Sequence, residues 1–151
     1  MQIIRLAPGE AERFENWLVM FGDVFAEPDT YTGAMPSPEY RDHLLANPHF
    51  IALAALEGDA IIGGLAAYVM PKFERERSEI YIYDLAVVDT HRRQGIATAL
   101  INEVRRRAPE WGAWVLMIQA DYEDEAPVAL YSKLGTREEV LHFDIAPLEE
   151  E

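Results

Sequence analysis

The spacing of apolar residues changes near residue 50. Before that point apolar side chains recur every three or four positions, which predicts a helix with one apolar face. This apolar face consists of Phe14, Trp17, Leu18, Phe21 and Phe25, and we expect Phe14, Trp17 and Phe21 to pack in the core. Residues 26–36 hold two prolines and a glycine, which predicts a loop. A second helix is expected from Ser37, with this serine as its N-terminal cap.

After residue 50 the pattern favours strands, because β-branched, aromatic and small apolar residues form runs separated by turn residues. Strands are predicted at 50–56, 60–70, 78–88, 113–120 and 138–145, in addition to a first strand at 2–6. The largely apolar run 113–120 is expected in the interior of a sheet. Further helices are predicted after Gly95 and at 127–134. This order predicts a mixed α/β sheet with helices on its faces.

Composition narrows the class of protein. The 151 residues fit one domain, 1–151, and the absence of cysteine leaves no disulfide or thiolate metal site. The formal charge of −14 argues against a nucleic-acid partner and suits a cationic small molecule. With neither a long apolar stretch nor a signal-peptide pattern, we expect a cytoplasmic protein without a membrane partner. The histidines lack metal-ligand spacing, so no metal site is predicted.

The stretch HRRQGIATAL, residues 91–100, follows a predicted strand and opens a predicted helix. The first amides of a helix have no partner within the helix, and the helix dipole adds positive potential there. Gly95 permits close approach of a ligand, and Arg92 and Arg93 add cationic donors. This arrangement predicts a cradle for a phosphate group. The stretch is neither the ATP-binding G-x-x-x-x-G-K-[ST] loop nor the dinucleotide G-x-G-x-x-G fingerprint.

The pattern Arg92-x-x-Gly95-x-Ala97 resembles the R/Q-x-x-G-x-G/A motif of the GCN5-related N-acetyltransferase (GNAT) superfamily. The preceding YDLAV looks like the central strand of that superfamily, and VALYSKLG, residues 128–135, looks like its A-x-x-L-Y-x-x-x-G-F helix. Thr136 replaces the usual phenylalanine. The resemblance implies the GNAT fold, an α/β fold whose mixed, mostly antiparallel central sheet is flanked by helices. It also implies acetyl-CoA as co-substrate.

From residue 50 to 146 the chain is more narrowly similar to the type I aminoglycoside 3-N-acetyltransferases, while the first third is looser. This similarity implies acetylation of the 3-amino group of deoxystreptamine in drugs such as gentamicin, and hence antibiotic resistance. It also implies a homodimer. Two alternatives stay open: a transferase for a polyamine or another small amine, and an acyl-CoA-binding sensor without turnover. Asp84 and Tyr131 argue against the sensor, which needs neither.

The resemblance assigns catalytic roles to two side chains. Asp84 would bind the substrate ammonium and accept its proton, and by strand alternation it is expected to share a face with Ile80, Ile82 and Ala86. An unpaired carboxylate on an apolar face is costly, so a structural carboxylate is the alternative. Tyr131 would protonate the departing thiolate, or be a core tyrosine. The amide of Val87 would donate to the oxyanion.

The remaining candidates bind ligands. The resemblance places a pantetheine arm on Leu85, Ala86 and Val87, and the pyrophosphate among Arg92, Arg93, Gly95, Ile96, Ala97 and Thr98. Carboxylates at the rim of the sheet would hold a polycationic aminoglycoside, or form a solvated acidic loop. The substrate-binding candidates are Glu79, Asp121, Glu123, Asp124, Glu139 and Asp144.

Overall fold

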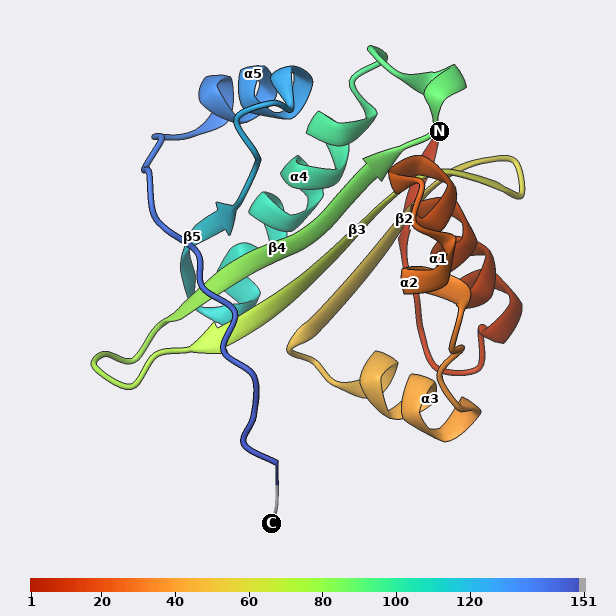
Figure 1. The fold of residues 1–151 in the computed structure, drawn as a ribbon, viewed down its shortest axis with the longest axis horizontal. Helices are drawn as coiled ribbons and strands as arrows, with labels where there is room; N and C mark the ends of the chain where they lie inside the picture. Colours follow the sequence, from red (N-terminus) through yellow and green to blue (C-terminus); the bar gives the residue numbers. More distant parts are fainter. Residues whose placement is uncertain (150–151) are drawn as a thin grey trace. The chain divides into compact units, whose positions relative to one another are not determined.

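The computed structural model describes residues 1–149, which form two compact units, residues 1–119 and residues 120–149. The first unit is built on one five-stranded sheet in the order β1-β2-β3-β4-β5 (Figure 1). Its strands are β1 Gln2–Arg5, β2 Phe50–Glu57, β3 Ala60–Pro71, β4 Ser78–Val87 and β5 Ala113–Ile118. The predicted strands of this unit are confirmed to within a few residues. The single-domain assignment stays a prediction.

Three of the four strand pairs are antiparallel, and only β4 and β5 run parallel. The predicted mixed, mostly antiparallel sheet is therefore confirmed. The expected interior position of residues 113–120 is wrong for the described residues, because β5 lies at the edge of the sheet and only β4 pairs with it. Apolar composition alone does not distinguish a strand paired on both sides from an edge strand whose side chains are half covered.

One face of the sheet is covered by α1 (Ala11–Phe25), which Figure 1 shows crossing the strands. Phe14, Trp17 and Phe21 are almost fully buried, as their spacing predicts. The Trp17 indole N–H donates to the Leu53 carbonyl oxygen at 2.9 Å. Gly64 on β3 makes room for this contact, since a Cβ there would lie 2.5 Å from Trp17 Nε1.

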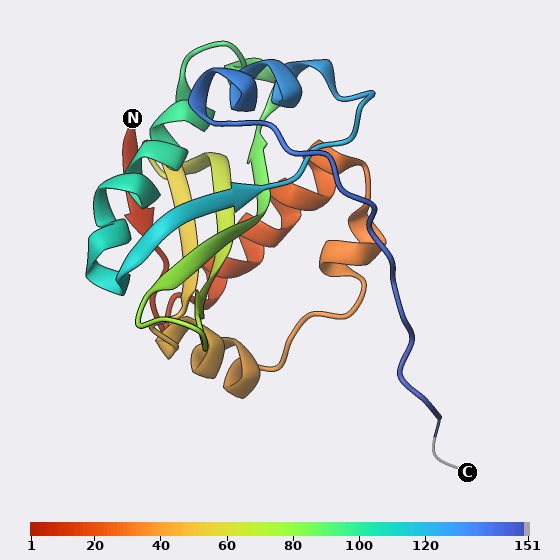
Figure 2. The same cartoon turned by 90° about the vertical axis from the view of Figure 1, so that its left-hand side faces the viewer.

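The opposite face is covered by α4 (Ile96–Arg107), which contacts β2, β3 and β4 (Figure 2). This helix was predicted after Gly95, and its Ile96, Leu100 and Val104 side chains are buried. A short 3₁₀ helix, η1 (Asp89–His91), connects β4 to the turn before α4, and a second, η2 (Ala108–Trp111), connects α4 to β5. The sheet is thus enclosed between helices on both faces.

Two further helices lie between α1 and β2. Helix α3 (Pro38–Ala46) starts where predicted, and the Ser37 hydroxyl accepts from the Tyr40 amide as an N-terminal cap. The expected loop at 26–36 contains a short helix, α2 (Pro28–Thr32). Its Pro28 lies in the first turn, where a missing amide costs nothing. The proline that suggested a loop therefore begins a helix.

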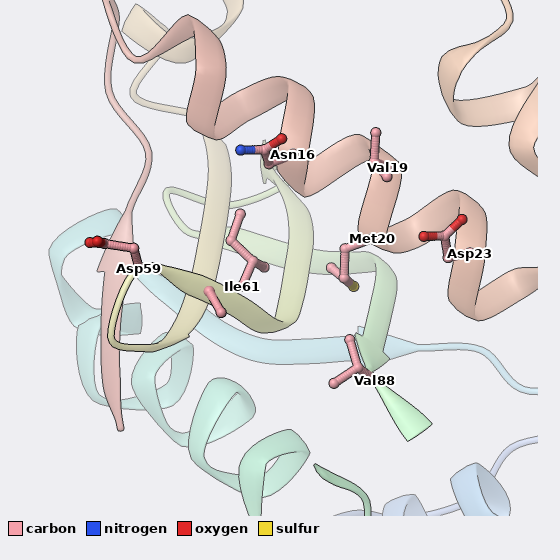
Figure 3. A pocket seen from close by; sticks show the side chains of 8 residues that line it. Asn16, Val19, Met20, Asp23, Asp59, Ile61 and Val88 are labelled. Atoms are coloured by element: carbon pink, nitrogen blue, oxygen red, sulfur yellow. The ribbon is translucent and has the colours of Figure 1, made fainter. Parts of the chain in front are cut away.

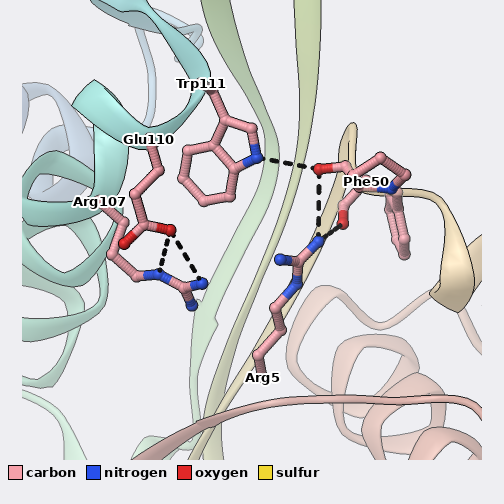
Figure 4. A network of polar contacts seen from close by, with 6 residues as sticks. Arg5, Phe50, Arg107, Glu110 and Trp111 are labelled. Atoms are coloured by element: carbon pink, nitrogen blue, oxygen red, sulfur yellow. Dashed lines mark hydrogen bonds and ion pairs between the residues drawn. The ribbon is translucent and has the colours of Figure 1, made fainter.

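A polar network joins the start of the sheet to η2 (Figure 4). Arg5 donates to the Phe50 carbonyl oxygen at 2.7 Å, and the Trp111 indole N–H donates to the Pro48 carbonyl oxygen at 3.0 Å. The Arg5 and Arg107 guanidinium groups both lie over the Trp111 ring. These contacts join β1, the start of β2 and η2 at the end of the sheet that is farthest from the turn at residue 95.

The second unit contains α5 (Glu125–Leu134), which starts two residues before the predicted helix. The strand predicted at 138–145 is wrong: these residues have no regular secondary structure, and Leu141, Phe143 and Ile145 are exposed. Alternating apolar residues become a strand only where another strand supplies hydrogen bonds, and no described strand pairs with them. The homodimer stays a prediction.

None of the helices in residues 1–149 combines the length and apolar character needed to cross a bilayer. Within the same residues, no three histidine, aspartate or glutamate side chains are grouped so that they could hold a metal ion.

Candidate active site

The turn before α4 has the geometry of an anion cradle. Gly95 has φ +79° and Arg93 has φ +60°, so the chain turns sharply between η1 and the helix. The first main-chain hydrogen bond of the helix runs from the Ala99 amide to the Gly95 carbonyl oxygen, and no side chain caps the turn. The amides of Ile96, Ala97 and Thr98 precede that bond and therefore face outward. A Cβ on Gly95 would meet no atom within 4 Å, so the approach is open.

The cationic side chains of this turn are exposed, and Arg92 pairs with Asp89 at 2.6 Å. An exposed pair of this kind contributes little to stability, so Arg92 can exchange Asp89 for an anionic ligand. Ile96 differs from the other predicted cradle residues because its side chain is buried beneath the helix. Only its main-chain amide can serve a ligand.

Strand β4 has a free edge just before this turn. Strand β5 pairs with β4 from Ser78 to Ile82 and no further, whereas β3 pairs with β4 as far as Val87. The two parallel strands therefore separate beyond Ile82, a feature that the sequence could not reveal. The Val88 amide donates to the Ile62 carbonyl oxygen on the β3 side. By alternation, the Val87 amide points toward the free edge, where an amide-containing ligand can pair with it.

A β-bulge in β4 places Asp84. Asp84 pairs with Ala66, but the next β3 residue, Ala67, pairs with Ile82, so Tyr83 is the extra residue of the bulge. The expectation that Asp84 shares a face with Ile80 and Ile82 is therefore wrong, because one inserted residue reverses the alternation. The expectation that Asp84 shares a face with Ala86 is confirmed. Ala86 and Ala66, the β3 partner of Asp84, both pack with the core that faces α1.

The bulge directs Asp84 into a cavity of about 230 Å³ between α1 and the sheet. The cavity is mainly aromatic and also receives residues from α2, α3 and the segment between them: its lining includes Trp17, Phe21, Tyr31, Phe50, Tyr68 and Tyr83. Asp84 is the one carboxylate among the lining residues. The arrangement can bind a single cationic group between aromatic faces.

Two neighbours act on the Asp84 carboxylate in opposite directions. Burial raises its pKa, the hydrogen bond from the Tyr31 hydroxyl lowers it, and the negative charge of Glu27 raises it. The Tyr31 hydroxyl donates to Asp84 Oδ2 at 3.0 Å. A carboxylate whose proton affinity is raised in this way is better suited to accept a proton from an amine.

Sequence reasoning missed the tyrosines around Asp84. The Tyr83 ring makes edge-to-face contacts with Tyr68 and with Tyr81, with ring centroids 6.1 Å and 5.7 Å apart, respectively. Tyr31 lies in the segment that was expected to be a loop. The tyrosines on adjacent strands were visible in the sequence, but the bulge that brings Asp84 onto the same face as Tyr83 was not.

The other predicted residues are distributed between the two units. Glu79 lies near the start of β4, where its carboxylate pairs with Lys72 at 3.0 Å. Tyr131 lies on α5 in the second unit, and burial followed by the charge of Asp124 raises its pKa to about 12. The remaining acids also belong to the second unit and are exposed: Asp121, Glu123, Asp124, Glu139 and Asp144. Glu139 pairs with Arg137, and Asp144 with His142, each at 2.8 Å.

A second cavity of about 320 Å³ lies on the same face, between α1 and the turn joining β2 and β3 (Figure 3). Its polar lining comes from Asn16, Asp23 and Asp59, and Val88 closes the side near the end of β4. This cavity contains none of the predicted site residues.

Residues 14–136 match the acetyltransferase (GNAT) family. The chain therefore belongs to this family, whose members use acetyl-CoA, and the sheet described above is the GNAT fold. A comparison with curated proteins found no match.

Solved structures give further points of comparison. An aminoglycoside acetyltransferase, HMB0005, from an uncultured soil metagenomic sample is 54% identical, with a TM-score of 0.94 over 97% of this chain and 98% of that one. A second, meta-AAC0020 from an uncultured soil metagenomic sample, in complex with sisomicin, is 32% identical, with a TM-score of 0.86 over 97% and 96%. A ribosomal-protein-alanine N-acetyltransferase from Brucella melitensis biovar Abortus 2308, at 23% identity and a TM-score of 0.73, shares the fold over 97% and 99%.

Proposed function

We propose that this protein transfers the acetyl group of acetyl-CoA to an amino group of an aminoglycoside. The observation that carries the proposal is the position of Asp84. It is a half-buried carboxylate in an aromatic cavity, and it lies on the same strand as the free edge at Val87. The similarity to two aminoglycoside acetyltransferases, one of them in complex with sisomicin, supports this acceptor class.

The residues around the turn fit acetyl-CoA. Outward amides at Ile96, Ala97 and Thr98, with Arg92 and Arg93, suit the pyrophosphate, and open space above Gly95 lets it approach. The free edge of Leu85, Ala86 and Val87 suits the pantetheine arm, because its amides pair like those of a peptide. When bound, acetyl-CoA supplies an acetyl group activated as a thioester.

Acetyl transfer requires a base for the amine, a donor for the oxyanion and an acid for the sulfur, and a group of this chain can supply each. Asp84 binds the acceptor ammonium and takes its proton, which frees the nitrogen lone pair for attack. The Val87 amide, directed at the free edge, stabilises negative charge on the acetyl oxygen. As the C–S bond breaks, the Tyr131 hydroxyl protonates the departing sulfur, and the second proton of the attacking nitrogen restores the tyrosine. The raised pKa of Tyr131 keeps it protonated at neutral pH. No covalent intermediate on the protein is required.

We further propose the 3-amino group of deoxystreptamine, in drugs such as gentamicin, as the acetylated position, and resistance as the consequence. The sequence similarity from residue 50 to 146 is what supports this finer assignment. Tyrosine faces beside Asp84 suit ammonium groups, and the net charge of −14 attracts a polycation. The acids Glu79, Asp121, Glu123, Asp124, Glu139 and Asp144 are candidates for holding further ammonium groups.

The test is thiol release from acetyl-CoA with gentamicin, sisomicin, kanamycin, spermidine and a lysine peptide, followed by NMR of the product to locate the acetyl group. Release with the aminoglycosides and an acetylated 3-nitrogen support the proposal. Release with spermidine alone would identify a polyamine transferase, and acetyl-CoA binding without release on any amine would identify a sensor. Asp84→Asn serves as the inactive control, with kcat/KM lower by at least about a hundredfold.

A further inference from the structure

The contact between Tyr31 and Asp84 joins residues from parts of the chain that are far apart. Tyr31 lies on α2, and its hydroxyl donates to Asp84 Oδ2 at 3.0 Å. The bond occupies one carboxylate oxygen and leaves Oδ1 available. We propose that Tyr31 is a positioning residue, which fixes the orientation of the Asp84 carboxylate and directs Oδ1 at the acceptor nitrogen. This role rests on the proposed function of Asp84 as the base.

The Tyr31 ring is held in place before any ligand binds. It stacks on Phe21 with ring centroids 5.7 Å apart and an interplanar angle of 19°, and it packs against Phe25 at 5.8 Å. Both phenylalanines come from α1. A ring held by two others has little freedom, so its hydroxyl can impose a direction on a carboxylate.

Close contact between α1 and α2 sets the position of the ring. A Cβ on Gly22 would lie 3.3 Å from Pro28 Cα and 3.5 Å from Tyr31 Cβ, so a larger residue would push α2 outward. The chain reverses between the helices at Ala26, which has a left-handed φ of +54°. The Glu27 amide donates to the Gly22 carbonyl oxygen at 2.9 Å and closes the turn. The left-handed conformation at Ala26 is unfavourable for a residue with a Cβ. The turn that it forms lets α2 pack on α1, and this packing brings Tyr31 to Asp84.

The hydrogen bond also keeps Asp84 able to act as a base. The ionisable groups that act on or face the carboxylate are Tyr31 and Glu27 at α2, Tyr68 on β3, and Tyr81 and Tyr83 on β4. Among these, Tyr31 alone donates a hydrogen bond to Asp84. Burial and Glu27 raise the carboxyl pKa, and the Tyr31 bond opposes them. Burial and the Asp84 charge raise the pKa of Tyr31, so its hydroxyl remains a donor over the working pH range.

The decisive variant is Tyr31→Phe, which keeps the stacked ring and removes only the hydroxyl. Its matched control is Tyr68→Phe, which removes a hydroxyl from the same cavity but no bond to Asp84. With Asp84 labelled at its carboxyl carbon, NMR titration of the free proteins should show a higher carboxyl pKa in Tyr31→Phe than in wild type. The pKa in Tyr68→Phe should stay close to wild type. An unchanged or lower pKa in folded Tyr31→Phe overturns the proposal.

Kinetics provide the second measurement. For Tyr31→Phe, kcat/KM for the amine at neutral pH should fall by about tenfold, as expected for loss of a hydrogen bond to a charged group. The acid limb of its pH profile should move to higher pH, while KM for acetyl-CoA should stay unchanged. A uniform loss of activity, with the limb in its original position, would indicate a purely structural role and contradict the proposal.

One measurement needs no variant. In the wild-type protein the Tyr31 Cζ resonance should titrate with the same midpoint as the Asp84 carboxyl carbon, and a flat Tyr31 signal through that midpoint contradicts the contact. The NMR readouts require no turnover, so they test Tyr31 even if no aminoglycoside is acetylated. If instead the enzyme is active and Asp84→Asn is inactive, a negative NMR result removes the role of Tyr31 and leaves the proposed function intact.

Discussion

Asp84 on β4 lies opposite Ala66 on β3, and Ile82, two residues before Asp84, lies opposite the very next β3 residue, Ala67. The extra residue between them, Tyr83, turns the carboxylate toward α1 and away from the face that carries Ile82. Ile82 itself is buried. The bulge thus allows one strand to contribute to the core and to present a carboxylate to a cavity a few residues later.

The carboxylate of Asp84 should reduce stability at neutral pH. Burial raises its pKa above the usual 3.8, against the opposing hydrogen bond from Tyr31. The folded state therefore binds a proton more tightly than the unfolded state, so stability falls as pH rises from 3.8 through the raised pKa. Asp84→Asn should melt at a higher temperature than wild type at pH 7, and the difference should vanish near pH 3.

The control for this comparison is Asp59→Asn, whose exposed side chain is hydrated in folded and unfolded protein alike. Its melting temperature should follow wild type at both pH values. A melting temperature for Asp84→Asn at pH 7 equal to or below that of wild type would contradict the burial of a charged group at this position.

Gly95 should matter for acetyl-CoA beyond its effect on the fold. Gly95→Ala places a Cβ at φ +79°, which costs roughly 1–2 kcal/mol, and directs it into the space through which the pyrophosphate would approach. We expect a KM for acetyl-CoA at least about tenfold higher, from loss of close main-chain contacts to a charged group. Steady-state kinetics with varied acetyl-CoA at saturating amine measure this KM.

Gly112 provides the matched control for Gly95. It also has a positive φ, +62°, and an added Cβ would meet no atom within 4 Å, but it follows η2 at the other end of α4. Gly112→Ala should lose a similar amount of stability and keep the wild-type KM for acetyl-CoA. Equal KM values for acetyl-CoA in the two variants would contradict the assignment of the turn at Gly95 as the pyrophosphate site.

Tyr131 should act in the chemical step. Burial raises its pKa to about 12, so the hydroxyl is a donor throughout the range of pH 7 to 9. Tyr131→Phe should lower kcat by about a hundredfold and leave both KM values nearly unchanged, because the lost bond would form only as the sulfur departs. Tyr40→Phe, an exposed tyrosine on α3, is the control and should retain full activity. Wild-type kcat in Tyr131→Phe would show that another group protonates the sulfur.

Gly64 should be intolerant of even a methyl group. An alanine Cβ would lie 2.5 Å from Trp17 Nε1 and 2.7 Å from Met20 Cε, while the hydrogen bond to Leu53 holds the indole in place. We expect Gly64→Ala to lower the free energy of unfolding by about 1–3 kcal/mol, measured by urea denaturation. An unchanged midpoint would mean that α1 can move away from the sheet without cost.

Much of this protein follows from the sequence alone. The three- and four-residue spacing of Phe14, Trp17 and Phe21 determined the first helix, and Arg92-x-x-Gly95-x-Ala97 after a strand indicated both the cradle and the family. These features depend on local spacing and on backbone conformations that particular residues favour, so a linear pattern records them.

Tertiary structure decided the rest. Only the pairing of β4 with β3 reveals the bulge at Tyr83, only the early end of β5 frees the edge at Val87, and only the packing of α2 against α1 brings Tyr31 to Asp84. The alternating apolar residues at 138–145 predicted a strand, but no strand forms there because no described strand pairs with them. In each case the outcome depends on hydrogen bonds and contacts between distant segments, which no periodicity within one segment encodes.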